Sequence, residues 1–568
     1  MKKIFYAALV AATMFGSVSC ESWLDVNENP NGPDGLIEPH LYLAPMQAEL
    51  AIALQNDGRY IGKYINNWHQ AAAETNWDRH GYTASSDAGA TLWRSTYYTS
   101  GLNLVNMIAS AEKDQKWEIV GIGHALQAYN WQITTDNHGE IIMSEAFDQT
   151  KSSFNYDKQE AVYAEVVKQA ELALAAFEKA KATPYANKTL LGLNANSDLM
   201  YGGDINKWIK FTYGILAINA SHLSNKSSYD PIKVAEYVDK SFASRADDAL
   251  IRFEGTNTTN ASFFGPMRGN IGSASGSINL RQSRFIVGLL DGTNAVLQDP
   301  ALVGQDPETI FANQHLKDPR LPVMLSPASD GQYRGIAYAG VSDYATASQP
   351  RSLWGTTSDN PPAASVGKYI FNNNASFPIM TYAQLQFIKA EALYRSNQKA
   401  PALQAYKNGV ESHMEYVKSF LTIPEERTLF DARKVKYLAS PLLVPTESTL
   451  TLSHIMLQKY VAQWGWGFIE TWTDLRRYHY VDSYNGSENV PGEPVPVGGD
   501  LDASDNVFRG YYFPTTAQMF SANNNMPAYR VRPRFNSEYM WNITSLQEIG
   551  ALDNAYHTYE MWFSKKGQ

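Results

Sequence analysis

Few residues of this chain have the type and spacing that catalysis or metal binding requires. The sequence contains no HExxH zinc motif, no CxxC motif and no phosphate-binding P-loop. Asp136, His138 and Glu140 are close enough in sequence to ligate a metal, but a turn after a helix explains their spacing better. The two carboxylates of a glycoside hydrolase are defined by their distance in space, so the sequence leaves that activity open.

The single cysteine, Cys20, has a context that favours lipid modification. It follows a basic start, an apolar run over 4–15 and the small residues of 16–19, which is the pattern of a secretory signal peptide. The apolar run is too short to cross a bilayer of about 30 Å as a helix. VSC at 18–20 resembles the lipobox of bacterial lipoproteins, in which the thiol is acylated. We therefore expect residues 1–19 to be removed and lipid on Cys20 to anchor the protein to a membrane.

The composition is that of a large globular protein. Hydrophobic residues make up 44% and charged residues 18% of the sequence, which are not the values of a disordered chain. The net charge of −10 argues against a nucleic acid as partner. No shift in composition marks a domain boundary, so we expect residues 20–568 to form a single domain.

Aromatic residues are abundant, with 13 Trp and 34 Tyr in the sequence. Both side chains combine an apolar ring face with a polar edge, and a sugar ring has matching apolar faces and hydroxyl edges. A large helical core would also use many aromatic residues. Taken as a set, the aromatic residues favour a ligand that stacks on rings.

Apolar residues recur at helical spacing in several segments that would position these side chains. In the first half, Asp157 and Glu160 predict a capping box before the second helix, and Asp204 predicts a side-chain cap before the third. The helices predicted there span 117–135, 161–182 and 205–223.

Residues 381–417 predict a pair of helices, with the second starting near Pro401. Ala390 and Ala402 are small residues where a hairpin of the tetratricopeptide type needs close contact, although no regular repeat runs along the chain. Long stretches rich in Gly, Ser and Asn separate the predicted helices. Because they contain aromatic residues, we expect ordered inserted loops, at about 253–376 and 482–526.

Several short motifs resemble, in their order along the chain, those of the SusD/RagB-type outer-membrane lipoproteins. CESWLDVNENPNGP at 20–33 resembles the start of the lipidated chain, and YGGDINKWIKF at 201–211 resembles the family's YGGDxxKWxKF helix start. IM at 142–143 replaces the usual Pro-Tyr, and YHY at 478–480 replaces Thr-Gly-Tyr-Pro, so the subfamily stays open. The other matches are the turn at 135–146, DPRLP at 318–322, FPIMTY at 377–382 and GFIETWTDLRR at 467–477.

The resemblance implies an all-α fold, a scaffold of tetratricopeptide-like helix pairs with long inserted loops, and a role in nutrient binding without a cofactor or catalysis. It also implies anchoring at the outer membrane, at the cell surface, and a TonB-dependent transporter of the SusC type as partner. The lipoprotein would cover this barrel and pass a glycan to it. A peptide is the alternative ligand, and a helical glycoside hydrolase is the alternative that the order of the motifs disfavours.

In similar proteins the aromatic residues that face the ligand come from an early loop and from mid-chain insertions. The early loop here spans 68–82, where Trp77 and Tyr82 would stack on a ring and the polar side chains would hydrogen-bond hydroxyls or a carboxylate. Alternatively, Trp68 and Trp77 pack the loop onto the body of the protein. We expect Trp464, Trp466 and Trp472 to be core residues. The candidate ligand-binding residues are Trp77, Asp78, Arg79, Tyr82, Asn76, Trp68, Trp354, Tyr333 and Phe264.

Overall fold

The computed structural model describes residues 37–567, except 273–278, 295–317, 339, 359, 363–365, 441–443, 481–506, 515–516 and 524–525. The predicted signal peptide, Cys20 and much of the predicted loop 482–526 lie outside the described residues. Helices dominate the described part, and its strands form two sheets of two strands each, so the predicted all-α class is confirmed. Across these residues, no helix is long and apolar enough to span a bilayer.

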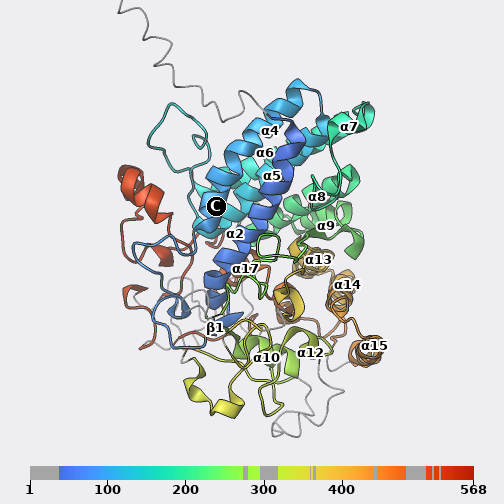
Figure 1. Cartoon of the computed structure of the whole chain (residues 1–568), viewed down its shortest axis with the longest axis vertical. Helices are drawn as coiled ribbons and strands as arrows, with labels where there is room; N and C mark the ends of the chain where they lie inside the picture. Colours follow the sequence, from blue (N-terminus) through green and yellow to red (C-terminus); the bar gives the residue numbers. More distant parts are fainter. Residues whose placement is uncertain are drawn as a thin grey trace, which may run out of the picture.

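Pairs of neighbouring helices build the scaffold (Figure 1). The pairs α5 and α6, α8 and α9, and α13 and α14 each pack side by side. The longer helices are α2 (Leu43–Tyr64), α4 (Gly101–Lys113), α5 (Trp117–His138), α6 (Gln159–Ala182), α8 (Ile205–His222), α9 (Pro231–Lys240), α10 (Arg284–Asp291), α13 (Tyr382–Arg395), α14 (Lys399–Lys418), α15 (Pro424–Ala439), α16 (Leu452–Gln463) and α17 (Phe468–Arg477). The short helices are α3 (Thr91–Arg94), α7 (Lys188–Leu191), α12 (Leu321–Met324) and α18 (Ile543–Glu548).

Two short antiparallel sheets join segments that are distant in sequence. β1 (Trp68–Gln70) pairs with β3 (Leu280–Gln282), and β2 (Ala249–Ile251) pairs with β4 (Phe377–Met380). The region predicted as inserted loops at 253–376 therefore contains β3 and the helices α10 and α12 as well as ordered loops.

The helix caps show which local predictions succeed. The carboxylate of Asp204 accepts hydrogen bonds from the amides of Asn206 and Lys207, so the cap predicted for α8 is confirmed. The capping box predicted at Asp157 is wrong. Its carboxylate instead accepts from the amides of Met143 and Ser144, each at 2.8 Å, and thereby holds the preceding turn.

The predicted hairpin of α13 and α14 is confirmed, and small residues allow the close contact. Ala390 and Ala402 are fully buried between the helices. A Cβ atom on Gly409 would lie 2.8 Å from Cζ of Phe387, so glycine is what lets α14 approach α13 this closely.

The GFIETWTDLRR motif forms α17 and carries charged residues into the core. Both terminal nitrogens of Arg477 bind the carboxylate of Glu391, at 2.8 and 2.9 Å, and Arg477 also pairs with Asp474 at 2.6 Å. Lys459 pairs with Asp474 and with Glu470. Because removal of one partner would leave a buried charge uncompensated, the cluster fixes how α13, α16 and α17 pack. The predicted core residues Trp464, Trp466 and Trp472 are buried around it.

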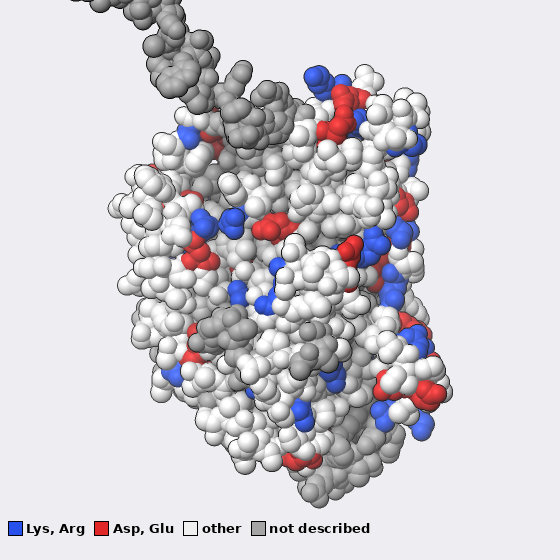
Figure 2. Space-filling view, in the orientation of Figure 1, with Lys and Arg blue, Asp and Glu red and all other residues white. Residues whose placement is uncertain are grey.

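Charged residues of both signs are mixed on one face of the molecule (Figure 2). On the face in Figure 2, Lys and Arg are mixed with Asp and Glu, and most of the area is uncharged. A nucleic-acid footprint would be a stripe of basic residues. The described residues on the face in Figure 2 form no such stripe, and the absence of a nucleic-acid partner stays a prediction.

Candidate functional site

The early loop at 68–82 is held in place by Glu74. Its carboxylate accepts hydrogen bonds from the amides of Trp77, at 3.0 Å, and Asp78, at 2.8 Å, and it pairs with Lys63 at 3.0 Å. Trp77 and Asp78 belong to a short 3₁₀ helix, η2 (Trp77–Arg79), which ends at the left-handed residue His80. The loop is therefore a rigid turn that fixes the positions of its aromatic residues.

Three of the predicted ligand-binding residues lie in the hydrophobic core. Trp68 is fully buried, and its ring packs against those of Phe264, Phe371 and Trp464. Phe264 is also fully buried, and Trp354 donates its indole N–H to the carbonyl of Phe264 at 2.8 Å. These rings offer no exposed face on which a ligand could stack, which differs from the expectation. Their size and polarity alone could not show this, because burial depends on contacts with residues far along the chain.

Some polar residues of the early loop are buried in structural contacts, and others remain accessible. Asp78 is buried, with one carboxylate oxygen 3.1 Å from Nδ1 of His69 and the other accepting from the amide of Gln70 at 3.2 Å. It is therefore not accessible to ligand hydroxyls in this structure, in contrast to the prediction. Asn76 and Arg79 are partly exposed, and Nε of Arg79 donates to the backbone carbonyl of Glu74.

The position of Trp77 is compatible with both expected roles, stacking on a ligand and packing the early loop onto the body of the protein. Its ring packs on Tyr60 and Tyr64, with centroids 4.9 and 5.2 Å away, and only 3% of the residue is exposed. The indole N–H donates to the hydroxyl of Thr83 at 3.0 Å. Trp77 thus fixes the loop to α2, while the remaining edge of its ring forms part of a cavity wall.

This first cavity has a volume of about 240 Å³ and lies between the early loop and the C-terminal segment 531–554. In Figure 1 the blue early loop and the red C-terminal segment lie on the same side of the molecule. Aromatic rings, hydroxyl groups, one amide and one guanidinium line it. They come from Trp77, Tyr82, Thr83, Ser85, Ser86, Arg532, Phe535, Tyr539 and Asn554.

The partly exposed rings surround the guanidinium of Arg532. Its central carbon lies 4.6 Å from the ring centroid of Tyr82 and 5.4 Å from that of Tyr539. Its hydrogen bonds go to backbone carbonyls, including that of Asp553 at 2.8 Å, and no described carboxylate forms an ion pair with it. Phe535 stacks on Tyr539 with the centroids 5.7 Å apart. The cavity therefore offers aromatic rings together with a guanidinium that forms no ion pair with a described carboxylate.

A second cavity of about 480 Å³ shares a wall with the first. The shared wall is η13 (Phe535–Tyr539), a π-helical turn whose Ser537 and Glu538 face the second cavity. Opposite lies another π-helical turn, η3 (Ser95–Thr99), which contributes Tyr97 and Tyr98. Tyr98 is 74% exposed. Turns of this kind are rare and occur frequently at functional sites. Hereafter the two cavities are called the paired cavities.

Sequence reasoning identified Tyr82 but missed most of the residues beside it. Tyr333, also predicted, lies apart from the paired cavities, partly buried against the core. The missed residues carry a recognisable signal in retrospect, since Tyr97 and Tyr98 form an aromatic doublet. RVRPRF at 530–535 alternates basic with apolar residues before the aromatic Phe535.

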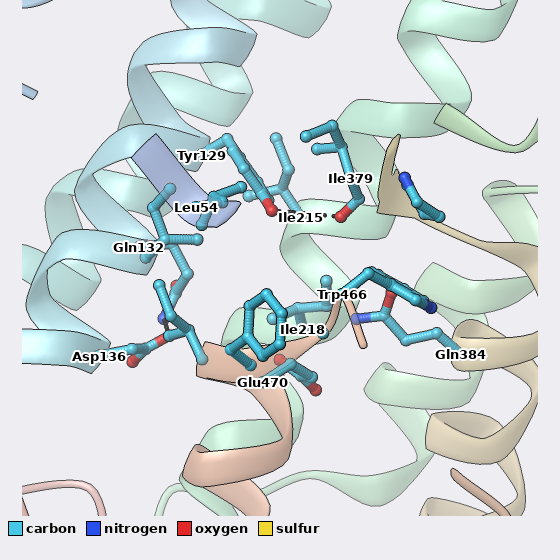
Figure 3. A pocket seen from close by; sticks show the side chains of 15 residues that line it. Leu54, Tyr129, Gln132, Asp136, Ile215, Ile218, Ile379, Gln384, Trp466 and Glu470 are labelled. Atoms are coloured by element: carbon cyan, nitrogen blue, oxygen red, sulfur yellow. Dashed lines mark hydrogen bonds between the residues drawn. The ribbon is translucent and has the colours of Figure 1, made fainter. Parts of the chain in front are cut away.

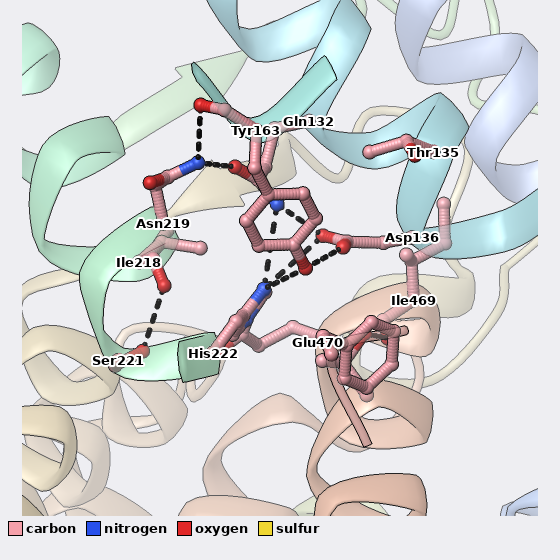
Figure 4. Close-up of polar contacts among 12 residues, drawn as sticks. Gln132, Thr135, Asp136, Tyr163, Ile218, Asn219, Ser221, His222, Ile469 and Glu470 are labelled. Atoms are coloured by element: carbon pink, nitrogen blue, oxygen red, sulfur yellow. Dashed lines mark hydrogen bonds and ion pairs between the residues drawn. The ribbon is translucent and has the colours of Figure 1, made fainter. Parts of the chain in front are cut away.

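Asp136, one of the residues weighed as a metal ligand, belongs to a buried polar network (Figure 4). Its carboxylate lies 3.3 Å from Nδ1 of His222 and accepts from the hydroxyl of Tyr163 at 2.5 Å. Nε2 of His222 lies 2.9 Å from Glu470. Burial alone would lower the pKa of His222, but the carboxylates of Glu470 and Asp136 outweigh it and raise the pKa to about 9. The imidazolium therefore ties α5, α8 and α17 together.

The network has no room for a substrate. The cavity beside Asp136 and Glu470 has a volume of about 30 Å³ (Figure 3). A water molecule needs roughly 10–15 Å³ of such volume, so one or two waters fit but a sugar ring does not. Among the described residues, no group of three or more His, Cys, Asp or Glu side chains could hold a metal ion. Asp136 and Glu470 are thus structural in this arrangement.

The chain resembles known proteins in sequence and in structure. The family model described as "Starch-binding associating with outer membrane", of the SusD-like type, matches residues 30–302 and 306–494. A search of the curated proteins gave no match. A SusD/RagB family protein from Bacteroides thetaiotaomicron aligns with a TM-score of 0.62 at 20% identity, over 94% of this chain and 100% of that chain. A chitin-binding SusD homologue from Flavobacterium johnsoniae aligns with a TM-score of 0.61 at 16% identity, over 93% of this chain and 99% of that chain.

Proposed function

This chain belongs to the SusD-like family of starch-binding proteins associated with the outer membrane, and on that premise we propose that it captures a glycan in the paired cavities. The proposal covers binding without turnover. The observation that carries it is the set of ring faces next to hydroxyl and amide groups between the early loop and the C-terminal segment.

The chemistry of the first cavity suits a sugar. The partly exposed rings of Tyr82 and Tyr539 would contact the apolar face of a pyranose beside the guanidinium of Arg532, which packs on both rings. Thr83, Ser85 and Asn554 provide hydrogen-bonding groups for hydroxyls. The volume of about 240 Å³ is below the roughly 300–1,000 Å³ of pockets that enclose drug-sized ligands. The cavity would therefore hold one ring of a chain.

The second cavity would hold the continuation of that chain. It adjoins the first across η13, and Asp87 fixes the shared wall by binding Arg534 at 2.7 Å and the side-chain amide of Asn536 at 2.6 Å. The exposed ring of Tyr98 is a stacking platform that needs no rearrangement of the core. A ligand longer than one sugar would thus contact both η3 and η13.

The same proposal includes a membrane anchor and a partner. Lipid on Cys20 would tether the protein to the outer membrane, and the polar stretch NENPNGP at 27–33 would connect the lipid to the folded body. The partner would be a TonB-dependent transporter of the SusC type that takes over the captured glycan. The lipobox-like sequence and the description of the family, which names the outer membrane, support the anchor. The partner rests on the resemblance of the sequence motifs to those of SusD/RagB-type lipoproteins.

A peptide is the second candidate ligand, and one observation favours it. Arg532 forms no ion pair with a described carboxylate, and a peptide carboxylate could pair with it. A neutral oligosaccharide would instead use the guanidinium as a hydrogen-bond donor. The two ligands therefore differ in how strongly salt should weaken their binding.

Calorimetric titration of the chain starting after Cys20 tests the proposal. Malto-oligosaccharides, chito-oligosaccharides and oligopeptides would be titrated into the wild type, into Tyr98→Ala and into Tyr82→Ala. Tyr237→Ala, which replaces a partly buried tyrosine of α9 that lines neither cavity, is the control. We expect one oligosaccharide class to bind and both cavity variants to lose about tenfold or more in affinity.

The other outcomes of the titration would change the proposed ligand, the proposed activity or the proposed location of the site. Binding of peptides alone would move the protein to the second candidate, and release of shorter sugars by pure protein would replace binding by hydrolysis. Glycan binding that survives both substitutions would contradict the location. Because Tyr98 is exposed, its replacement should leave the circular dichroism spectrum unchanged, so a loss of binding there reports on the ligand.

A further inference from the structure

A third cavity, of about 470 Å³, lies away from the paired cavities. It is enclosed by α12, by the segment 366–372 and by the junction between α14 and α15. In Figure 1 these helices lie at the lower right, whereas the red C-terminal segment that lines the paired cavities lies at the left. The third cavity is therefore a separate site.

The lining of the third cavity is apolar with a small charged group. Two cations, Lys368 and Arg433, and one carboxylate, Glu426, are its charged residues, so they carry a net positive charge when all three are ionised. Asn372 and Thr422 add polar atoms. The apolar lining consists of Pro319, Pro322, Val323, Val366, Tyr369, Phe420, Leu421, Leu429 and Phe430.

The environment of Lys368 indicates an anionic ligand. Within the described part of the chain, its ammonium has no hydrogen bond and no ion pair. Burial lowers the pKa of Lys368 to about 8, although the negative charge of Glu426 opposes the shift. Holding an ammonium in a partly buried position without a partner is unfavourable, and an anion in the cavity would relieve that cost.

Tyr369 adds an independent observation at the same place. It is 4% exposed, and its hydroxyl has no hydrogen-bond partner among the described residues. Its backbone lies in the left-handed region, with φ of 51°, which is rare and strained for a bulky residue. Gly367 makes the turn possible, because a Cβ atom there would lie 1.9 Å from the carbonyl oxygen of Phe371. The chain thus holds Tyr369 beside the cavity in an unfavourable backbone conformation, next to Lys368, whose own backbone is extended.

Hydrogen bonds and ring packing hold the opposite wall of the third cavity. Arg427 donates to the carbonyls of Lys418 and Leu421, at 3.2 and 2.9 Å, and so closes the junction between α14 and α15. The ring of Phe420 packs on Tyr369 with centroids 4.8 Å apart. The cavity is therefore bounded on both sides by ordered structure, which is what a preformed ligand site needs.

We propose that the third cavity binds a small organic carboxylate with an apolar, ring-containing body. The carboxylate pairs with Lys368 and lies near Arg433, and the body packs against Phe420, Leu429 and Phe430. This site does not depend on the glycan site, because the two share no lining residue. A neutral sugar would leave the ammonium unpaired and would place its hydroxyls against apolar side chains.

Titration calorimetry with three probes, phenylacetate, indole-3-acetate and cyclohexanecarboxylate, tests the proposal. We expect at least one probe to bind saturably at millimolar or lower concentration. The matching uncharged alcohol should bind at least about tenfold more weakly than the acid. Lys368→Met should lose about tenfold in affinity or more. Lys407→Met, which removes an exposed lysine on α14, should bind like the wild type.

A second readout is the number of protons taken up when a carboxylate binds. Binding of a carboxylate raises the pKa of Lys368, so at a pH of about 8.5 binding should take up a fraction of a proton, measured from the heats in two buffers of different ionisation enthalpy. At pH about 6 the lysine is already protonated and no uptake should occur. Absence of binding by all three probes, equal binding of acid and alcohol, or proton uptake that persists in Lys368→Met would each overturn the proposal.

Discussion

Replacement of His222 by Gln should reveal how much one buried ion network contributes to stability. The carboxylates of Glu470 and Asp136 raise the pKa of His222 from an ordinary value of 6.5 to about 9. A difference of about 2.5 pH units, at roughly 1.36 kcal/mol per unit, corresponds to about 3 kcal/mol of stabilisation by the imidazolium. The side chain is fully buried, so solvent does not screen this interaction.

The sign of the pH dependence follows from the direction of the shift. A pKa that is raised on folding stabilises the native state fully below about pH 6.5, and this stabilisation is lost as the pH rises through about 9. The glutamine variant lacks this contribution at every pH. We therefore expect the wild type to exceed His222→Gln in unfolding free energy by about 3 kcal/mol near pH 6 and by much less near pH 10.

Urea unfolding followed by tryptophan fluorescence, from about pH 6 to 10, measures this difference. Taking the difference between the two proteins removes the contributions of the other titrating groups that they share. His124→Gln, on the neighbouring helix α5, is the matched control, because among the described residues His124 contacts Gln169 and forms no ion pair with a carboxylate. A stability difference for His222→Gln that stays constant or grows with pH would refute the reasoning.

Three further predictions concern the loop, the core and the anchor. Gly89→Ala should lower the unfolding free energy by about 1 kcal/mol or more and weaken glycan binding. The reason is that φ of Gly89 is +76° and the new Cβ atom would lie 2.6 Å from the ring of Trp77. An unchanged urea midpoint and an unchanged affinity would contradict this prediction. Arg477→Met should cost about 3 kcal/mol in the same assay, because it removes the bidentate partner of the buried Glu391 and leaves only Arg395 and the hydroxyl of Tyr478 on that carboxylate. A neutral effect would show that the cluster is dispensable. Cys20→Ala should release the folded protein from the membrane fraction, and retention there would contradict the lipid anchor.

Local sequence signals predicted the scaffold well. The helical spacing of apolar residues located α5, α6, α8 and the α13–α14 hairpin. Of these, α6 buries one face, whereas α5 is buried on nearly all sides. The cap at Asp204 was predictable because donor and acceptor lie within three residues of each other. Asp157 failed because its carboxylate binds amides of an earlier turn, and a cap motif does not show such tertiary competition.

The candidate site was less predictable than the scaffold. The early loop was located through its resemblance to a family, and Tyr82 does line a cavity. Whether a tryptophan faces a ligand or the core depends on partners far along the chain, and Trp68 packs on rings at 264, 371 and 464. Arg532 could not be placed beside Tyr82 from sequence, because the pair depends on how the C-terminal segment packs on the loop.

A crystal structure of the chain with the best-binding oligosaccharide tests the central claim most directly. The account predicts a sugar ring against Tyr82 in the first cavity, with the chain continuing past η13 toward Tyr98. Hydroxyls of the bound ring should lie within hydrogen-bonding distance of Thr83, Ser85 or Asn554. An oligosaccharide bound elsewhere on the surface, with the paired cavities holding only water, would contradict the account.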